Sequence, residues 1–121
     1  MKVLDSSGII NLRGDELSGD FLTVPEIREE LRDIQSKNKF EAAVADKRIR
    51  IAEPSKESLD KIRDISEKNG ALPLLSIPDL KVLALAYEKK LPIVTDDYDI
   101  QNICKVAGLD FETIAMPGIK T

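Results

Sequence analysis

Short apolar runs alternate along this chain with stretches in which apolar residues recur every three or four positions. The short runs are typical of buried strands, and the longer period is typical of helices with one buried face. Because parallel strands need helical crossovers between them, the alternation predicts an α/β fold with a parallel sheet. The segments expected to form strands are 2–5, 48–52, 91–95 and 110–115.

Two segments have the sequence of a capped helix start. Thr23-Val24-Pro25-Glu26 combines a capping Thr, a Pro in the first turn and a Glu at the third position, which predicts the start of a long helix. Ile27, Leu31 and Ile34 would form its buried stripe. Ser76-Ile77-Pro78-Asp79 repeats the capping pattern. Residues 80–87 behind it are apolar nearly all round, so we expect that helix at the buried centre of the fold.

The other expected elements follow from ordinary helix boundaries. A short helix is expected over 6–12 and a polar loop over 14–20. Ser55 can cap a helix that ends at Asn69-Gly70, and a further helix from about 98 to 107 would end at Gly108. With no repeat or linker in 121 residues, we expect a single domain over residues 1–121.

Four acidic positions lie where apolar segments end or helices begin: Asp5, Glu30, Asp79 and the pair Asp96–Asp97. Each of them, taken alone, also fits a helix cap or a boundary residue. In an open parallel sheet, however, ligands bind at the carboxyl ends of the strands, and two of these sites end expected strands. Carboxylates gathered there repel one another. A bound Mg²⁺ or Mn²⁺ removes that repulsion, because hard cations prefer oxygen ligands.

Glu30 is selected from its neighbours by its direction on the expected helix. At 100° per residue it lies about 65° from the centre of the apolar stripe. Glu29 points to the opposite side, and Glu26 lies farther from the stripe. Glu30 is therefore expected at the edge of the core, where its carboxylate can reach inward.

The residue types that are absent limit the chemistry. The chain contains no histidine and a single cysteine, Cys104. A Ser-His-Asp centre, a histidine-ligated metal and a cysteine zinc site within this chain are thereby excluded. A lone cysteine, no apolar run long enough to cross a bilayer and no signal-peptide pattern lead us to expect an intracellular protein without a membrane partner. Cys104 and Tyr98 are interpreted as structural.

Charge is distributed unevenly around a formal net value of −4. Residues 37–63 carry 8 basic and 5 acidic residues, and the remainder carries 10 basic and 17 acidic ones. The basic segment is either an ordinary solvated face or a surface that contacts phosphates. Its candidate RNA-binding residues are Lys37, Lys39, Lys47, Arg48 and Arg50.

Four segments together resemble the PIN-domain nucleases, and most of all the Nob-type ribosome-assembly endonucleases: 3–7, 23–33, 75–88 and 93–102. The resemblance implies a PIN-like three-layer α/β/α fold with a central parallel sheet of about four to five strands. It also implies one or two Mg²⁺ or Mn²⁺ ions held by Asp5, Glu30, Asp79 and Asp97. Asp96 would be an auxiliary acid in that metal site, and Ser6 and Thr95 would be supporting hydroxyls.

The activity implied by the resemblance is metal-dependent hydrolysis of single-stranded RNA, in rRNA maturation and ribosome assembly in the cytoplasm. The expected products carry a 5′-phosphate and a 3′-hydroxyl. Two alternatives stay open: a VapC-type toxin ribonuclease with an antitoxin partner, and a non-catalytic PIN-like module that binds RNA or the ribosome. A homodimer is left open as well. Nob-type proteins continue into a Cys-x-x-Cys zinc ribbon that this sequence lacks, so no zinc is expected in this chain.

Overall fold

A parallel sheet of five strands forms the middle of the computed structural model, which describes residues 1–13 and 19–114. The order of the strands is β3-β2-β1-β4-β5, and every neighbouring pair is parallel. The predicted α/β class is therefore confirmed. The strands are β1 (Lys2–Leu4), β2 (Phe21–Thr23), β3 (Ile49–Ile51), β4 (Ile93–Val94) and β5 (Phe111–Glu112).

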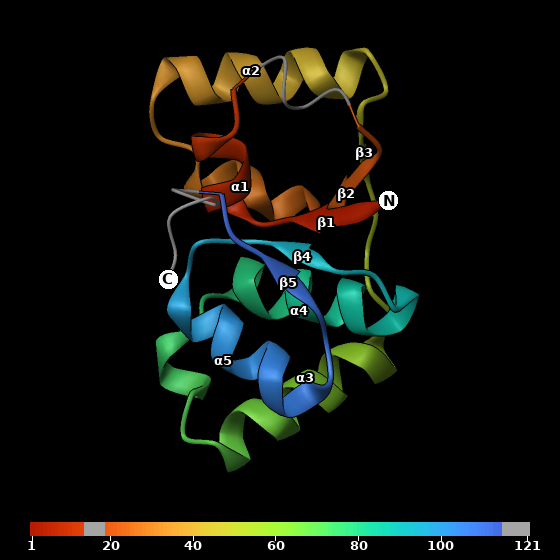
Figure 1. Cartoon of the computed structure of the whole chain (residues 1–121), viewed down its shortest axis with the longest axis vertical. Coiled ribbons are helices and arrows are strands. Elements are labelled where there is room, and N and C mark those ends of the chain that lie inside the picture. Colours follow the sequence, from red (N-terminus) through yellow and green to blue (C-terminus); the bar gives the residue numbers. More distant parts are fainter. Residues whose placement is uncertain (14–18, 115–121) are drawn as a thin grey trace.

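Helices cover both faces of the sheet and give the predicted three layers (Figure 1). One face carries α1 (Ser6–Asn11) and α2 (Ile34–Ala45). The other carries α3 (Lys56–Lys68), α4 (Ile77–Lys89) and α5 (Tyr98–Ala107). Two short 3-10 helices, η2 (Pro25–Glu30) and η3 (Leu72–Leu74), lie in the connections.

The direction of the chain through the sheet changes at β1. The chain goes outward from β1 through β2 to β3, and then returns to place β4 and β5 on the other side of β1. At such a switch point the connections leave a crevice outside the carboxyl ends of the two central strands. This rule places the expected ligand site of the fold between the ends of β1 and β4.

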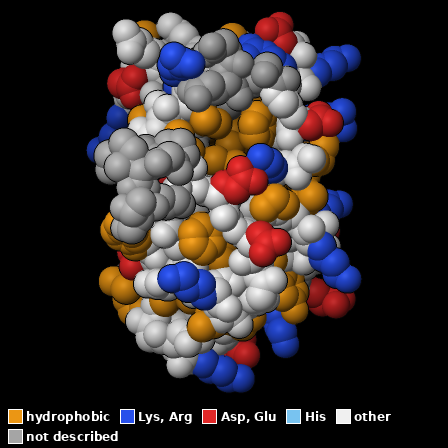
Figure 2. Space-filling model, in the orientation of Figure 1, with side chains coloured by type: hydrophobic (Ala, Val, Ile, Leu, Met, Phe, Trp, Pro, Cys, Tyr) orange, Lys and Arg blue, Asp and Glu red, His pale blue; other side chains and the backbone are white. Residues whose placement is uncertain are grey.

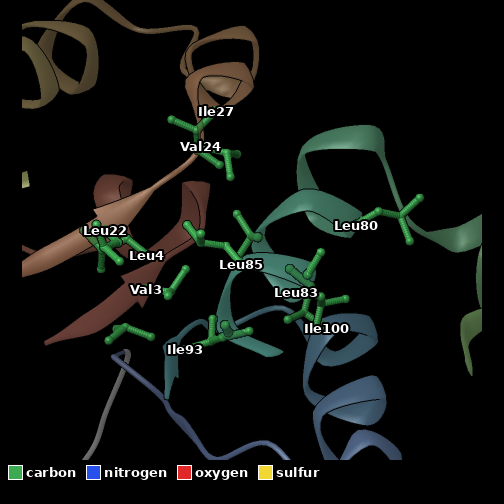
Figure 3. Close-up of a cluster of buried hydrophobic side chains, with 14 of the residues drawn as sticks. Val3, Leu4, Leu22, Val24, Ile27, Leu80, Leu83, Leu85, Ile93 and Ile100 are labelled. Carbon is green, nitrogen blue, oxygen red and sulfur yellow. The ribbon is translucent and has the colours of Figure 1, made fainter. Parts of the chain in front are cut away.

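Helix α4 forms the buried centre, as its apolar sequence predicts. Residues Val82–Ala86 are all completely buried. In Figure 3, Leu85 lies toward Val3 of β1, and Leu83 lies toward Ile100 of α5. Each fully buried Leu stabilises the fold by about 1.5–3 kcal/mol relative to an exposed one. This packing fixes the first turn of α4 against the carboxyl ends of β1 and β4.

The predicted long helix from Thr23 is wrong. Thr23 ends β2, and its Oγ1 donates a hydrogen bond to the carbonyl oxygen of Leu4 in β1 at 2.7 Å. The helix that follows is a six-residue 3-10 helix, and α2 starts separately at Ile34 with Asp33 as its N-cap. The run Phe21-Leu22-Thr23-Val24 has strong strand preference, which here prevails over the capping-box pattern. Ile34 is 71% exposed, so the predicted buried stripe holds only for Ile27 and Leu31.

The other helix boundaries agree with the prediction, whereas the strands expected over 91–95 and 110–115 are shorter in the structure. α3 is capped by Ser55 and ends before Asn69, and α5 ends at Gly108, whose φ of 74° is left-handed. Most of the predicted loop over 14–20 lies outside the described residues. Ala115, the last residue of the predicted final strand, also lies outside the described residues. The observed strand, β5, spans Phe111–Glu112.

A close approach at Gly8 holds α1 against the sheet. A Cβ atom at this position would lie 3.0 Å from the carbonyl oxygen of Val94 and 3.0 Å from Cδ2 of Leu4. The backbone oxygen cannot move without displacing β4. The absence of a side chain at residue 8 therefore lets the first turn of α1 lie directly over the ends of β1 and β4.

Gly8→Ala is expected to lower the free energy of unfolding by about 1–3 kcal/mol, because the methyl group overpacks this contact. Urea unfolding followed by circular dichroism measures the change. Gly19→Ala is the matched control, since a Cβ there meets only Phe21 ring atoms at 3.5 Å or more. Equal stability of Gly8→Ala and the wild type would contradict the proposed contact.

Candidate active site

The predicted acids gather at the carboxyl edge of the sheet. Asp5 follows β1 and Asp97 follows β4, and these two strands are neighbours. Asp79 lies in the first turn of α4, and Glu30 ends η2. The charge of Asp97 raises the pKa of both Asp5 and Asp79, and the charge of Glu30 also raises the pKa of Asp79. Asp97 is thus close enough to repel Asp5 and Asp79, and Glu30 is close enough to repel Asp79.

Asp5 is held rigidly and is nearly inaccessible, with 2% of its surface exposed. Its Oδ1 accepts hydrogen bonds from the backbone N–H of Gly8 at 2.8 Å and from Ser7 Oγ at 2.7 Å. Its Oδ2 accepts a hydrogen bond from Thr95 Oγ1. Burial, and to a smaller degree the charge of Asp97, raises the pKa of Asp5 to about 6 although these three hydrogen bonds lower it. Asp5 therefore both caps α1 and contributes a constrained carboxylate to the site.

Ser76 connects Asp79 to Glu30. It forms the predicted capping box with Asp79: Asp79 N donates to Ser76 Oγ at 3.1 Å, and Ser76 N donates to Asp79 Oδ2 at 3.0 Å. The same Ser76 hydroxyl donates to Glu30 Oε2 at 2.9 Å. Burial raises the pKa of Asp79, and the charges of Glu30 and Asp97 act in the same direction. One serine thus aligns two acids from different elements.

Glu30 has an oxygen that is not satisfied. Its Oε1 is buried and has no hydrogen-bond partner among the described residues. Sequence analysis placed Glu30 at the edge of the core by assuming a continuous α-helix, and that helix does not exist. Glu30 still reaches the site because η2 follows β2 at the same edge of the sheet. A buried carboxylate oxygen without a partner is costly unless a cation or donor meets it.

The two adjacent aspartates have different environments. Asp96 Oδ1 accepts from the N–H of Ile114 at 2.7 Å, and its Oδ2 accepts from Asn11 Nδ2 at 3.0 Å. Asp97 uses Oδ1 to cap α5 through the N–H of Asp99 at 2.8 Å. Its Oδ2 receives no hydrogen bond from the part of the chain that the structure describes. Asp97 therefore retains a free oxygen at the site, whereas both oxygens of Asp96 hold the fold together.

The acids fit a hard divalent cation in the chemistry of their donors. All the candidate ligands are carboxylate oxygens, burial raises two of their pKa values, and Glu30 Oε1 lacks a partner. Mg²⁺ and Mn²⁺ prefer such ligands. As they stand, no three acidic side chains within residues 1–13 and 19–114 are arranged closely enough to hold an ion.

Sequence analysis missed two supporting hydroxyls. Ser7 rather than Ser6 donates to Asp5, and Ser7 Oγ also accepts from the N–H of Asp96 at 2.9 Å. This contact joins the ends of β1 and β4 and has no local sequence signal. Ser76 was recognised as a cap, but its bond to Glu30 depends on how η2 packs against α4. Thr95, the predicted support, is fully buried and bonds Asp5.

Lys81 forms an ion-pair network beside the acids. Its Nζ lies 2.5 Å from Glu26 Oε2 and 3.3 Å from Glu53 Oε1. Glu26 lies on η2 and Glu53 follows β3, so Lys81 ties both segments to α4. The charge of Lys81 is therefore paired with Glu26 and Glu53 and not with the four predicted site acids.

The predicted RNA-binding residues are divided between the two edges of the sheet. Lys47 and Arg48 precede β3, at its amino end and away from the acids, and Arg50 lies on β3. Lys37 and Lys39 lie on α2, where Lys39 Nζ donates to the carbonyl oxygen of Leu12 at 2.5 Å. On the face drawn in Figure 2, Lys and Arg side chains are interspersed with acidic and apolar ones.

A cavity of about 570 Å³ lies elsewhere, lined by residues that include Tyr87, Lys90, Leu109 and Asp110. Lys90 precedes β4 and Asp110 precedes β5, so the cavity is at the amino edge of the sheet. The four acids do not line it. The cavity and the predicted acidic site therefore lie at opposite edges of the sheet.

A five-stranded parallel sheet between helical layers, with acids converging at its switch point, defines a PIN-like nuclease domain. Residues 3–88 match the family model of the PIN domain of ribonuclease. The chain is 38% identical over 118 residues to Endoribonuclease Nob1 of Pyrococcus abyssi, covering 98% of this chain and 70% of that protein. It is 35% identical over 123 residues to Endoribonuclease Nob1 of Methanothermobacter thermautotrophicus, covering 98% of this chain and 71% of that protein.

Ribonuclease VapC3 of Aeropyrum pernix is also similar, with 33% identity over 112 residues that cover 88% of this chain and 81% of that protein. The chain belongs to the PIN-domain ribonucleases and is of the Nob type.

Asp5 is expected to make the metal-free protein less stable as pH rises. Its pKa is about 6 in the folded protein and near 3.8 without the fold. Below about pH 4 the carboxyl is neutral in both states, and above about pH 6 its charge destabilises the folded state by about 3 kcal/mol. Asp5→Asn keeps a good N-cap and removes the charge. In urea unfolding with EDTA, this variant should become more stable relative to the wild type between pH 4 and pH 7.

The relevant quantity is the difference between the two proteins, because acids that do not interact with Asp5 titrate equally in both. A difference that stays constant from pH 4 to pH 7 would show that Asp5 has an ordinary pKa.

Proposed function

We propose that this chain is a Mg²⁺- or Mn²⁺-dependent endoribonuclease that hydrolyses phosphodiesters of single-stranded RNA. Asp5, Glu30, Asp79 and Asp97 hold one or two ions. The observation that carries the proposal is the buried, partnerless Glu30 Oε1 beside three other carboxylates at the switch point of a PIN domain. Gathering these charges destabilises the fold, so the stability of the domain does not explain their placement.

The chain's own residues prepare the site. Such an ion, when bound, supplies an activated water and offsets the charge that develops on the phosphate. Ser7, Gly8 and Thr95 prevent Asp5 from rotating, and Ser76 keeps Glu30 and Asp79 in register. Among the described residues, Glu30 Oε1, Asp79 Oδ1 and Asp97 Oδ2 receive no hydrogen bond and are available to bind an ion. Since the chain has no histidine, protons must move through water and carboxylates.

Phosphates of the RNA approach from the side of η2 and α2 in this proposal. Arg32 is exposed and follows Glu30 by two residues. Lys37, one turn into α2, lines a small surface cavity together with Leu31, the residue that follows Glu30. Contacts from these cations add affinity with little sequence preference. Lys47 and Arg48 precede β3 at the opposite edge of the sheet, so they would contact only an RNA strand that extends around the sheet.

The biological role proposed is rRNA maturation in ribosome assembly, in the cytoplasm. It follows the Nob1 relatives, whose similarity extends over nearly the whole chain. Among the described residues, no helix is long and apolar enough to span a membrane. The VapC relatives favour a second candidate, a toxin ribonuclease that an antitoxin peptide inhibits. Both candidates use the same acids.

Cleavage of a single-stranded RNA with Mn²⁺ tests the reaction. Asp5→Asn and Asp79→Asn are expected to reduce kcat by about 100-fold or more. Losing a residue that only supports a metal ligand costs about 10–100-fold, and losing a ligand itself should cost at least as much. EDTA should abolish cleavage by the wild type. Glu29→Gln is the control, because Glu29 is an exposed acid next to Glu30 and should retain full activity. Equal rates for the wild type and both Asn variants would rule out the proposed reaction.

Asp96 and Asp97 are distinguished by comparing Mn²⁺ affinity with stability. Asp97→Asn should weaken Mn²⁺ binding at least about 10-fold in calorimetric titration. Asp96→Asn should mainly lower the free energy of unfolding, by about 1 kcal/mol, through its contacts to Asn11 and Ile114. The reverse result, with metal affinity dependent on Asp96, would exchange the two roles.

A further inference from the structure

Tyr98 is an aromatic residue that the fold leaves in water at the edge of the acidic site. It is the first residue of α5 and 79% exposed, more than any other large apolar side chain noted as exposed in the described residues. The sequence led us to interpret Tyr98 as structural, but burial in the core does not explain this residue. Its ring contributes little to folding, so the stability of the domain does not explain a tyrosine here.

The position of Tyr98 relative to the acids is fixed by the chain. It directly follows Asp97, and consecutive Cα atoms are about 3.8 Å apart. Ile77 occupies the same first position on α4, two residues before Asp79, and is 58% exposed. Both helices begin at the carboxyl edge of the sheet and pack against each other. Two exposed, uncharged side chains therefore flank the acids at their helix starts.

Charge around Tyr98 determines what it can bind. Asp96 and Asp97 precede it and Asp99 follows it. An RNA phosphate close to these acids is repelled in the absence of a cation, so backbone contacts alone hold the strand poorly on this side. Stacking of a base on an aromatic ring does not depend on phosphate charge, and it occurs with every base. A neutral ring can therefore bind the RNA strand on this side, where contacts to its phosphates are weak.

We propose that Tyr98 stacks on a base of the single-stranded RNA adjacent to the phosphate held at the acids, and so positions that phosphate for cleavage. The inference rests on the proposed function and adds to it a substrate-binding residue. Stacking requires an unpaired base, which makes Tyr98 a determinant of the preference for single strands.

The composition of the chain allows a direct spectroscopic test. There are two tyrosines and no tryptophan, so Tyr87→Phe leaves Tyr98 as the only tyrosine fluorophore. Tyr87 is half-buried near the amino edge and serves only to be removed. Titration of this variant with oligouridylate in Ca²⁺ is expected to quench the fluorescence of Tyr98. An oligomer of the same length with abasic riboses should not quench it.

Kinetics with Mn²⁺ and oligouridylate give the second readout. Tyr98→Ala is expected to raise KM about tenfold, the effect of losing one stacked base, while Tyr98→Phe stays within about twofold of the wild type. Ile77→Ala is the matched control for an exposed apolar residue on the same rim. Because Tyr98 is exposed, circular dichroism should show all these variants folded.

The outcomes separate the two claims. A wild type that cleaves RNA, combined with an unchanged KM for Tyr98→Ala and no quenching, would overturn the stacking and leave the proposed function intact; the ring would then face a protein partner. Quenching by the abasic oligomer would overturn base stacking as well. If the wild type neither binds nor cleaves single-stranded RNA, the proposed function fails first and the inference fails with it.

Discussion

Repulsion among carboxylates at the switch point is the constraint on which the site depends. Asp5 is 2% exposed. Burial and, to a smaller degree, the charge of Asp97 raise its pKa to about 6, although three hydrogen bonds to its carboxylate lower the pKa. Glu30 adds a buried oxygen without a partner. The core compensates for this cost, because α4 is buried on nearly all sides and fixes Asp79 in its first turn. In the proposed function, a bound divalent cation would offset part of this cost by neutralising the carboxylates.

Connections between elements keep the acids in place without a rigid cage. Ser7 bonds both Asp5 and the N–H of Asp96, which joins β1 to β4. Ser76 bonds both Asp79 and Glu30, which joins α4 to η2. A change at Ser76 is therefore expected to alter the relative position of Asp79 and Glu30, and a change at Ser7 is expected to alter the position of Asp5 relative to the end of β4. The comparison of Asp96 with Asp97 follows the same logic, since only Asp97 keeps an oxygen free.

The sequence predicted what local pattern determines and failed where tertiary contacts decide. Parallel strands, the caps at Ser55 and Ser76 and the buried α4 follow from periodicity and capping residues. β2 was missed because Thr23-Val24-Pro25-Glu26 also has the form of a capping box, and the contact of Thr23 with Leu4 has no local signal. Glu30 was selected with a helix that does not form, so its arrival at the site rests on β2 and η2. Tyr98 was taken as structural because burial of an isolated aromatic cannot be judged from its neighbours.

The pKa of Asp5, measured with and without Mg²⁺, tests the central claim most directly. The carboxyl ¹³C chemical shift of Asp5 can be followed by NMR from pH 3 to pH 8. Without metal, the pKa should be about 6. With saturating Mg²⁺ it should fall to the ordinary range near 4 or below, because the cation stabilises the charged form. A pKa that stays near 6 in Mg²⁺, or one that is already near 4 without it, would contradict the account.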